Sequence, residues 1–249
     1  MSLMSPYELK MKLDLADDRA KFVKEHSMSD KMNAIVTDDG HMHLFNCKGD
    51  DITKSVTSIG DGTFYKCASL KSIAIPDSVK SIGKGAFCCC TNLTTIIIPN
   101  SVISIKDSVF SHCESLTSIS ISDSVKSIGD NAFYNCKSLK SIVIPSSVES
   151  IGYDAFSNCK NLTSIVIPDS VASIGGYAFR WCTDLTSIVI PDSVMSIGSW
   201  AFYGCESLTS IVFKGKTLEE VKSMDNYSWG VEDLWGVEDK SVFKAKRSR

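Results

Sequence analysis

The chain has 249 residues, of which 43% are hydrophobic and 22% are charged, and its formal net charge is −3. This is the composition of a soluble protein that is long enough to bury a sizeable core, and its slightly acidic balance argues against nucleic acid as a partner. No run approaches the roughly 20 apolar residues that a membrane-spanning helix requires, so we expect no membrane insertion.

The first 53 residues are predicted to form an N-terminal cap. The segment "SPYE" has the pattern of a helix capping box, with Ser5 as the N-cap residue and Glu8 three positions later. An apolar helix face follows at Leu9, Leu13, Ala16, Ala20 and Val23. The stretch "NAIVTDDGHMHLF" then predicts a β-hairpin that turns at residues 38–40.

Residues 54–213 repeat with a period of 23 that never slips. The unit is "LTSIVIPDSVxSIGxxAFxxCxx", and it occurs seven times without insertion. Phenylalanine recurs at Phe64, Phe87, Phe110, Phe133, Phe156, Phe179 and Phe202. Cysteine recurs at Cys67, Cys90, Cys113, Cys136, Cys159, Cys182 and Cys205. A unit this short cannot form its own core, so each copy must stack on its neighbours in a solenoid.

Each unit is expected to contain two extended pieces and one tight turn. "L-x-x-I-x-I" predicts a short strand with its isoleucines pointing inward, and the proline that follows ends it. "V-x-S-I-G" predicts a second short strand that closes on a glycine turn. "xxAFxxC" predicts one helical or 3₁₀ turn that places Phe and Cys in the core. The fold class is therefore an α/β repeat solenoid.

The repeat "IPDSVMSIGSWAFYGCESLTSI" and its sister copies resemble the BspA-type leucine-rich repeats, a 23-residue class. The resemblance covers residues 54–213, with departures at Ser122 for Pro, Lys106 for Gly and Val109 for Ala, which we expect only to loosen local turns. It implies a right-handed superhelix, a protein-binding or adhesive role, and no enzyme active site. It also implies a cell-surface or secreted location, whereas a native start at Met4 would indicate the cytoplasm because no secretory signal follows.

Residues 214–249 are predicted to form a C-terminal cap that ends in a basic tail. "KTLEEVKSM" contains a second capping box, formed by Thr217 and Glu220, which would open a short helix. The phrase "WGVEDLWGVED" follows and places Trp229 and Trp235 as apolar plugs over the last repeat. A ligand site at these tryptophans is the alternative interpretation.

Recognition residues should vary between copies at exposed positions, and two surfaces meet this criterion. The first is the outward row of the strand face, which we call the strand-face ribbon: Ala74, Ile97, Ser120, Val143, Val166, Val189 and Val212. A contiguous exposed apolar area favours a contact surface. The alternative is that β-branched residues are chosen here only because they suit strands.

The second surface lies around the "GxxAFxx" turn of the last three repeats, where aromatic residues gather. This aromatic cluster consists of Tyr153, Tyr177, Arg180, Trp181, Trp200 and Tyr203. Equal repeat phase predicts Tyr177 beside Trp200, and Arg180 beside Tyr203. Tyr, Trp and Arg dominate the binding energy of protein interfaces. The alternative is that the C-terminal cap folds back over these side chains.

The ten cysteines are interpreted as a mostly reduced structural ladder, because side chains in register point in parallel and seven members cannot all pair. The clusters "CCC" (residues 88–90) with "SHC", and "HMH" (residues 41–43) before Cys47, do not supply four converging ligands, and adjacent cysteines are expected to point apart. We therefore predict no metal and no cofactor. Cys88 and Cys89 lie off the ladder and are the candidate reactive thiols.

No histidine, carboxylate and nucleophile stand in a catalytic spacing, so we predict no enzyme activity. The function that the sequence favours is a protein-binding or adhesion module, monomeric or weakly oligomeric, that uses the strand-face ribbon and the aromatic cluster. Host or extracellular-matrix proteins are the candidate partners. The alternative is an intracellular interaction or architectural solenoid without a host-facing role.

Overall fold

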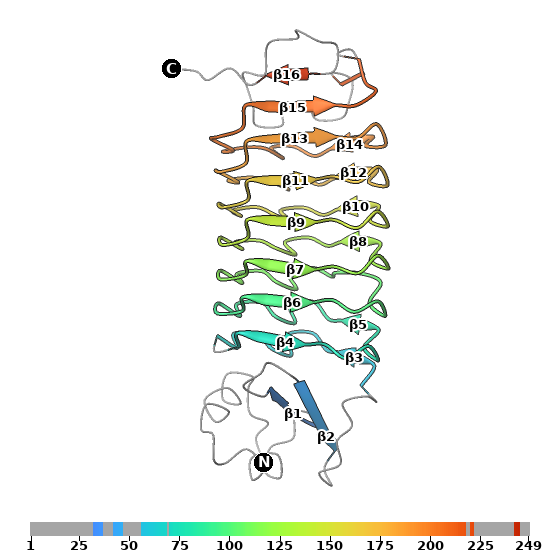
Figure 1. Cartoon of the computed structure of the whole chain (residues 1–249), viewed down its shortest axis with the longest axis vertical. Coiled ribbons are helices and arrows are strands. Elements are labelled where there is room, and N and C mark those ends of the chain that lie inside the picture. Colours follow the sequence, from blue (N-terminus) through green and yellow to red (C-terminus); the bar gives the residue numbers. More distant parts are fainter. Residues whose placement is uncertain are drawn as a thin grey trace.

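The computed structural model describes residues 56–217 except Ser69, residues 220–221, and the backbone of three further short strands. Within this range the chain winds into coils of 23 residues that stack along one axis (Figure 1). The coil length and the register that the sequence predicts are therefore confirmed.

The first sheet contains one strand from each coil, and its strands pair in parallel. In chain order the strands are β4 (Ser72–Ala74), β6 (Thr95–Ile97), β7 (Ser118–Ser120), β9 (Ser141–Val143), β11 (Ser164–Val166), β13 (Ser187–Ile190) and β15 (Ser210–Phe213). Equivalent residues are partners, as in the pairing of Ile142 with Ile165. The inward isoleucines are buried, except that Ile119 and Ile121 of the third coil are only partly buried, so the strands contribute their apolar faces to one continuous core.

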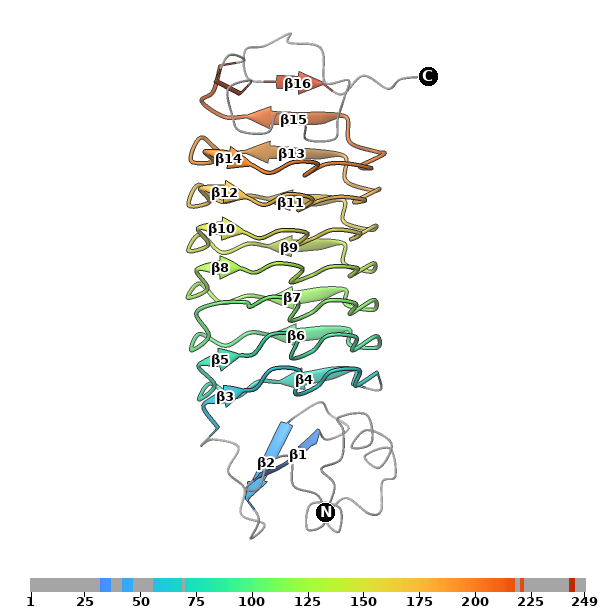
Figure 2. The ribbon, with the colours of Figure 1, turned by 180° about the vertical axis from the view of Figure 1, so that it is seen from behind.

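The second sheet lies behind the first and is built from the shorter "SI" strands, as the reverse view shows (Figure 2). They are β3 (Ser58–Ile59), β5 (Ser81–Ile82), β8 (Ser127–Ile128), β10 (Ser150–Ile151), β12 (Ser173–Ile174) and β14 (Ser196–Ile197). The glycine that follows these strands lies against the preceding coil. A Cβ atom built on Gly175 would lie 2.5 Å from the carbonyl carbon of Gly152, which explains why glycine recurs here.

The third side of the coil is a compact turn, which we call the outer turn: residues 61–66 in the first coil and their equivalents in the later ones. The expected helical turn takes the form of successive turns closed by bonds to the residue three positions back, such as Cys67 N–H to the Phe64 carbonyl. In each of the first six outer turns, three further N–H groups donate to the next coil. In the first coil they belong to Gly62, Phe64 and Lys66.

Two backbone positions in every outer turn have a positive φ angle. The first position contains Gly62, Gly85, Ser108, Asn131, Asp154, Tyr177 and Trp200. The second contains Lys66, Cys89, His112, Asn135, Asn158, Trp181 and Gly204. Left-handed backbone is adopted readily by Gly and tolerated by Asn and Asp, but it is costly for other side chains.

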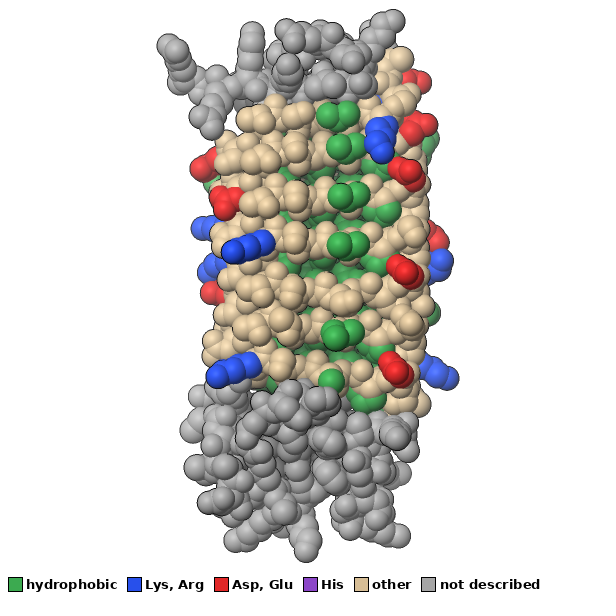
Figure 3. Space-filling model, in the orientation of Figure 1, with side chains coloured by type: hydrophobic (Ala, Val, Ile, Leu, Met, Phe, Trp, Pro, Cys, Tyr) green, Lys and Arg blue, Asp and Glu red, His purple; other side chains and the backbone are tan. Residues whose placement is uncertain are grey.

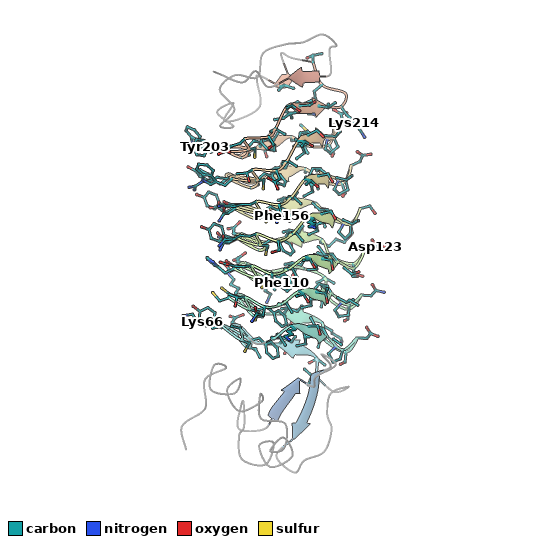
Figure 4. The ribbon with its side chains drawn as sticks, turned by 60° about the vertical axis from the view of Figure 1, so that its left-hand side comes forward. Lys66, Phe110, Asp123, Phe156, Tyr203 and Lys214 are labelled. Carbon is teal, nitrogen blue, oxygen red and sulfur yellow. The ribbon has the colours of Figure 1, made fainter. Side chains whose placement is uncertain are left out.

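The seven repeat phenylalanines form one internal column. Their rings stack with centroids 5.1 Å apart at Phe64–Phe87 and 5.7 Å apart at Phe179–Phe202. Figure 4 shows Phe110 and Phe156 inside the solenoid, between the sheet and the outer turn. The predicted core column is therefore confirmed.

The repeat cysteines form a buried ladder beside this column. Each thiol from Cys90 onward donates to the carbonyl of the phenylalanine one coil back, as Cys159 Sγ does to the Phe133 oxygen at 3.2 Å. Burial raises the pKa of the Cys159 thiol to about 12. All nine described cysteines are free thiols, in agreement with the predicted reduced ladder.

Both sheets are interrupted around the third and fourth coils. Strand β7 has no pairing to β9, and in place of an "SI" strand the third coil has a single bridge from Ile105 to Ile128. Ser120 and Ser122 replace the Val and Pro of other copies here, and Lys106 brings a side chain to the close-contact glycine position. The effect of these departures therefore extends beyond the local turns. We call this break the seam.

The ends of the solenoid differ from its middle. At the C-terminal end, β16 (Val242–Lys244) adds an antiparallel strand to β15, which the sequence did not indicate. The capping box is confirmed, because Thr217 N–H donates to the Glu220 carboxylate at 2.7 Å and Glu220 N–H donates back to Thr217 Oγ1. At the N-terminal end, β1 (Met32–Val36) and β2 (Met42–Asn46) form an antiparallel pair.

Several predicted features fall outside the described residues. They are the N-terminal helix over residues 5–23, the turn at residues 38–40, and the plugs Trp229 and Trp235. The division into caps and repeats therefore stays a prediction at both ends. Within the part of the chain that the structure describes, no helix has both the length and the apolar character that crossing a bilayer requires.

Candidate partner-binding surfaces

Most of the strand-face ribbon is exposed, as the sequence predicts, but Val212 is half-buried where β15 pairs with β16. Val143 and Val166 are 80% and 74% exposed, and their strands align them in one row with Val189 and Val212. Figure 3 shows this apolar row running along the middle of the face. Ser120 interrupts the row at the seam, so four valines on one side form its longest stretch.

Hydroxyl groups line the ribbon. Ser141, Ser164 and Ser187 are exposed two residues before the valines. The threonine column one position earlier is already engaged, because Thr209 Oγ1 donates to the carbonyl of Thr186 at 3.1 Å and other members repeat this bond. The serines are therefore the neighbouring polar groups that a partner could use.

The aromatic cluster is assembled by ring contacts between neighbouring coils. Tyr153 and Tyr177 meet edge to face with centroids 5.4 Å apart, and Trp181 meets Tyr203 at the same distance. Trp200 also contacts Tyr203, at 5.2 Å. The sequence predicts these residues on one surface and Tyr177 beside Trp200. The ring contacts observed within the cluster are other pairs.

Arg180 lies over the ring of Tyr177, with 5.1 Å between the guanidinium carbon and the ring centroid. The predicted neighbour of equal repeat phase, Tyr203, belongs to the next coil, and that pairing stays a prediction. The pair Tyr177–Arg180 lies within one outer turn, three residues apart, so the local turn brings the cation over the ring. A cation in this position is attracted by the negative face of the aromatic system.

The backbone under the cluster is unusual. Tyr177, Trp181 and Trp200 all have positive φ angles, at 56°, 57° and 60°. Other coils place small or amide side chains at most of these positions, where a bulky residue costs about 1–2 kcal/mol. The ring of Trp181 also lies against the backbone of Gly204, where a Cβ atom would approach to 2.5 Å. Sequence analysis missed this strain because the phase alone does not reveal φ.

A buried charge lies under the aromatic cluster. Asp154 is only 9% exposed, and its Oδ1 atom has no hydrogen-bond partner within the described structure. Burial raises the pKa of this carboxyl above its usual value, although Ser157 and Arg180 act in the opposite direction. The Nε atom of Arg180 is likewise buried and without a hydrogen bond. Asp154 and Arg180 therefore each have one buried polar atom whose hydrogen-bonding capacity is unused within the described structure.

A polar chain occupies the outer turns between the seam and the aromatic cluster. Asn135 contacts His112 Nδ1 at 2.9 Å, donates to Glu114, and accepts a hydrogen bond from Asn158. Lys137 completes it with an ion pair to Glu114 at 3.0 Å. These groups satisfy one another, so we assign them to the scaffold.

Neither the metal nor the catalytic interpretation gains support from this geometry. Among the residues that the structure describes, no three His, Cys, Asp or Glu side chains gather as ligands for a metal ion. His41 and Cys47 lie outside the described residues. The candidate recognition surfaces are thus an exposed row on the first sheet and an aromatic surface on the outer turns.

These features define a protein class: a parallel β-solenoid whose internal residues repeat and whose outer residues vary. Residues 41–163 and 151–230 match the model of the "BspA type Leucine rich repeat region", in six copies. The chain therefore belongs to the BspA-type leucine-rich-repeat family. Proteins of this family are typically non-enzymatic scaffolds, and their solenoids generally serve as protein-interaction modules.

Similar solenoids have been solved from several bacteria. The Treponema pallidum leucine-rich repeat protein TpLRR is 25% identical, with a TM-score of 0.50, over 73% of this chain and 90% of that one. A Bacteroides ovatus leucine-rich repeat protein is also 25% identical, with a TM-score of 0.42, over 74% of this chain and 70% of that one.

A leucine-rich cell surface protein of Faecalibacterium prausnitzii is 32% identical, with a TM-score of 0.43. That match covers 64% of this chain and 58% of the solved protein. A comparison with curated proteins finds no match.

Proposed function

We propose that this protein is a non-enzymatic recognition module that binds a protein partner through the aromatic cluster, with the strand-face ribbon as a second contact surface. The observation that carries the proposal is the placement of Tyr177, Trp181 and Trp200 at left-handed backbone positions. Folding alone would favour Gly or Asn there, because these residues adopt that conformation at lower cost. Strain that is kept at a surface is a reason to infer a function for it.

The chemistry of the cluster fits a protein partner. It offers flat aromatic faces and one guanidinium, which are the groups that contribute most at protein interfaces. Tyr153 and Tyr203 are 47% and 39% exposed, so they are available to a partner in the free protein. The ribbon adds an apolar row flanked by serine hydroxyls. The solenoid holds both surfaces on a rigid frame, which lowers the entropy cost of binding.

The test is a quantitative binding measurement with matched variants. A partner is first captured with the full chain from surroundings that contain host and matrix proteins, and its affinity is then measured by titration. We expect Trp181→Asn with Trp200→Asn to weaken binding at least 100-fold, since such anchors contribute about 2 kcal/mol or more each. The free energy of unfolding should change by only about 1 kcal/mol, because lost packing is offset by relief of strain.

The ribbon is tested by Val143→Lys with Val166→Lys, which introduces charge without touching the core. We expect a smaller loss of affinity, about 10-fold, from this pair. Lys80→Ala on the second sheet is the control and should leave binding unchanged. Full affinity in the double tryptophan variant would contradict the proposal for the aromatic cluster, and full affinity in the lysine variant would remove the ribbon from it.

Packing of the C-terminal cap over the aromatic cluster is the competing explanation. It can be tested by fluorescence, because the chain has four tryptophans and Trp229→Phe with Trp235→Phe leaves only the two of the cluster. Acrylamide should quench this remaining emission readily in the free protein. Protection comparable to that of a buried indole would show that the cap occupies the surface.

An intracellular interaction or architectural role is the second candidate, and the free cysteines favour it. Nine described thiols persist without a disulfide, which suits a reducing compartment. A secretory signal encoded upstream in the native gene would support the adhesion role, with a host-facing partner, over this one. In denaturant without reductant, we expect all ten cysteines to react as free thiols.

A further inference from the structure

Cys88 and Cys89 converge on the outer turn of the second coil. Their Sγ atoms are 3.6 Å apart, which is a van der Waals contact between sulfurs. The sequence-based expectation that adjacent cysteines point apart is therefore wrong here. It holds for extended backbone, but Cys89 is at one of the left-handed positions, with φ at 62°, and this brings the second side chain back toward the first.

The pair is accessible and local to one coil. Both residues are partly exposed, whereas the third cysteine of the "CCC" run, Cys90, is buried and donates to the Phe64 carbonyl. Cys88 and Cys89 occupy the same repeat positions as Tyr203 and Lys66, which Figure 4 shows on one edge of the molecule, opposite Asp123 and Lys214. No other described outer turn places thiols at these two positions.

We infer that Cys88 and Cys89 form a two-thiol binding site for a soft, trivalent, thiophilic ligand, of which a trivalent organoarsenical is the model. Thiol sulfurs select soft acceptors, and two sulfurs already in contact can bind one such atom with little movement of the chain. In the reaction with an arsine oxide, two S–H bonds and the As=O bond break and two As–S bonds form. The oxygen leaves as water with both thiol protons, and no electron is transferred.

The protonation state of Cys88 distinguishes this chemistry from alkylation of a single thiol. Burial, reinforced by the contact with Cys89, raises the pKa of the Cys88 thiol to about 12, so this group carries its proton at pH 7. Alkylation requires a thiolate and should be slow at Cys88. Arsenic capture is instead favoured by the two adjacent sulfurs, which bind one arsenic atom together. Cys88 should therefore react slowly with an alkylating agent, whereas the pair should still hold a reagent that bridges two thiols.

Two other fates of the pair fit the geometry less well. A disulfide needs the sulfurs at about 2.05 Å with a dihedral angle near 90°. Cys89 is held in its left-handed conformation by its N–H bond to the Ser111 carbonyl, which opposes that closure. A structural zinc site needs four ligands, and the described residues supply no group of even three.

The experiment uses phenylarsine oxide with the full-length reduced protein and intact-mass detection. We expect one phenylarsine adduct per chain that survives excess monothiol but is removed by dimercaptopropanol. Cys88→Ser and Cys89→Ser should each abolish the monothiol-resistant adduct. Cys47→Ser is the matched control and should retain it. Circular dichroism of the serine variants should match that of the parent protein, because both positions are on the surface.

Each alternative outcome overturns the inference. A resistant adduct in either serine variant would place the reagent on another pair, such as two ladder neighbours. An adduct that monothiol removes would show single-thiol binding only. Oxidised glutathione could instead convert the pair to a disulfide, which lowers the protein mass by two hydrogen atoms. If the protein as isolated already has this lower mass and does not bind the arsenical, the pair has a redox role.

Discussion

At the scale of the residue, the left-handed backbone positions separate side chains that suit this conformation from side chains that are strained by it and that we propose to be functional. Asn131, Asn158 and Gly85 adopt these positions at low cost, whereas Trp181 and Cys89 do so at a penalty. The repeat phase could be read from the sequence, but these φ values could not, because the consensus does not conserve Gly at them. The proximity of Cys88 to Cys89 was mispredicted for the same reason.

Asp154 provides a test of the buried charge at this scale. Its folded-state pKa lies above the unfolded value, so the native state favours the protonated acid and loses stability as pH rises through that interval. We expect Asp154→Asn to raise the melting temperature at pH 7 by about 2–4 °C. The gain should vanish below the unfolded pKa, where both states are protonated. A scanning-calorimetry series from pH 3 to 7 measures this, and equal gains across the series would refute it.

At the scale of the element, the unit of structure is the coil with its three sides. The strand at "LTSI" and the proline stop could be predicted, because hydrophobic alternation and proline chemistry are local signals. The glycine was predicted only as a turn, and its close contact with the preceding coil was not. The outer turn was predicted as one helical or 3₁₀ turn, and it forms successive turns with bonds of the 3₁₀ type, to the residue three positions back. Its remaining N–H groups bond to the next coil. The conformation of the outer turn depends on its hydrogen bonds to the next coil, and the sequence of a single repeat does not reveal these bonds.

The close glycine contact predicts a strong and position-specific effect. In Gly175→Ala the new methyl group would lie 2.5 Å from backbone of the preceding coil, so the two coils must separate. We expect a loss of about 2–3 kcal/mol in the free energy of unfolding, measured by urea denaturation. Lys106→Ala is the matched control, since the third coil already accepts a side chain at this phase. Similar stability of the two variants would contradict the explanation.

At the scale of the whole molecule, stability should be close to a sum over coils and their interfaces. Seven repeats and their register followed from the 23-residue period, and the stacked phenylalanines confirm it. The seam and strand β16 were not predicted as such. Single substitutions signalled the seam, but whether a ladder survives them depends on both neighbouring coils, and β16 pairs across more than 25 residues of sequence.

The seam gives a prediction for the molecule as a whole. Restoring the consensus with Ser120→Val and Ser122→Pro should join β7 to β9 and raise the free energy of unfolding by about 1 kcal/mol. Amide exchange at residues 117–121 and 140–144 should slow in this variant. Glu149→Ala, an exposed change beyond the seam, should alter neither quantity. Unchanged exchange across the seam would show that the serines are not its cause.

The outer-turn hydrogen bonds have a further consequence for the molecule. Every backbone-to-backbone bond between neighbouring outer turns runs from an N–H to a carbonyl in the following coil, so the stack is directional. Among the described residues, no N–H of another coil bonds to the carbonyls of Asp61, Thr63 and Tyr65 in the first coil, and the N–H groups of Trp200, Phe202 and Gly204 in the last coil find no such acceptor. Uncovered, the two faces would be mutually complementary and would favour head-to-tail filaments. Covering either face would thus keep each rod separate, besides shielding its core.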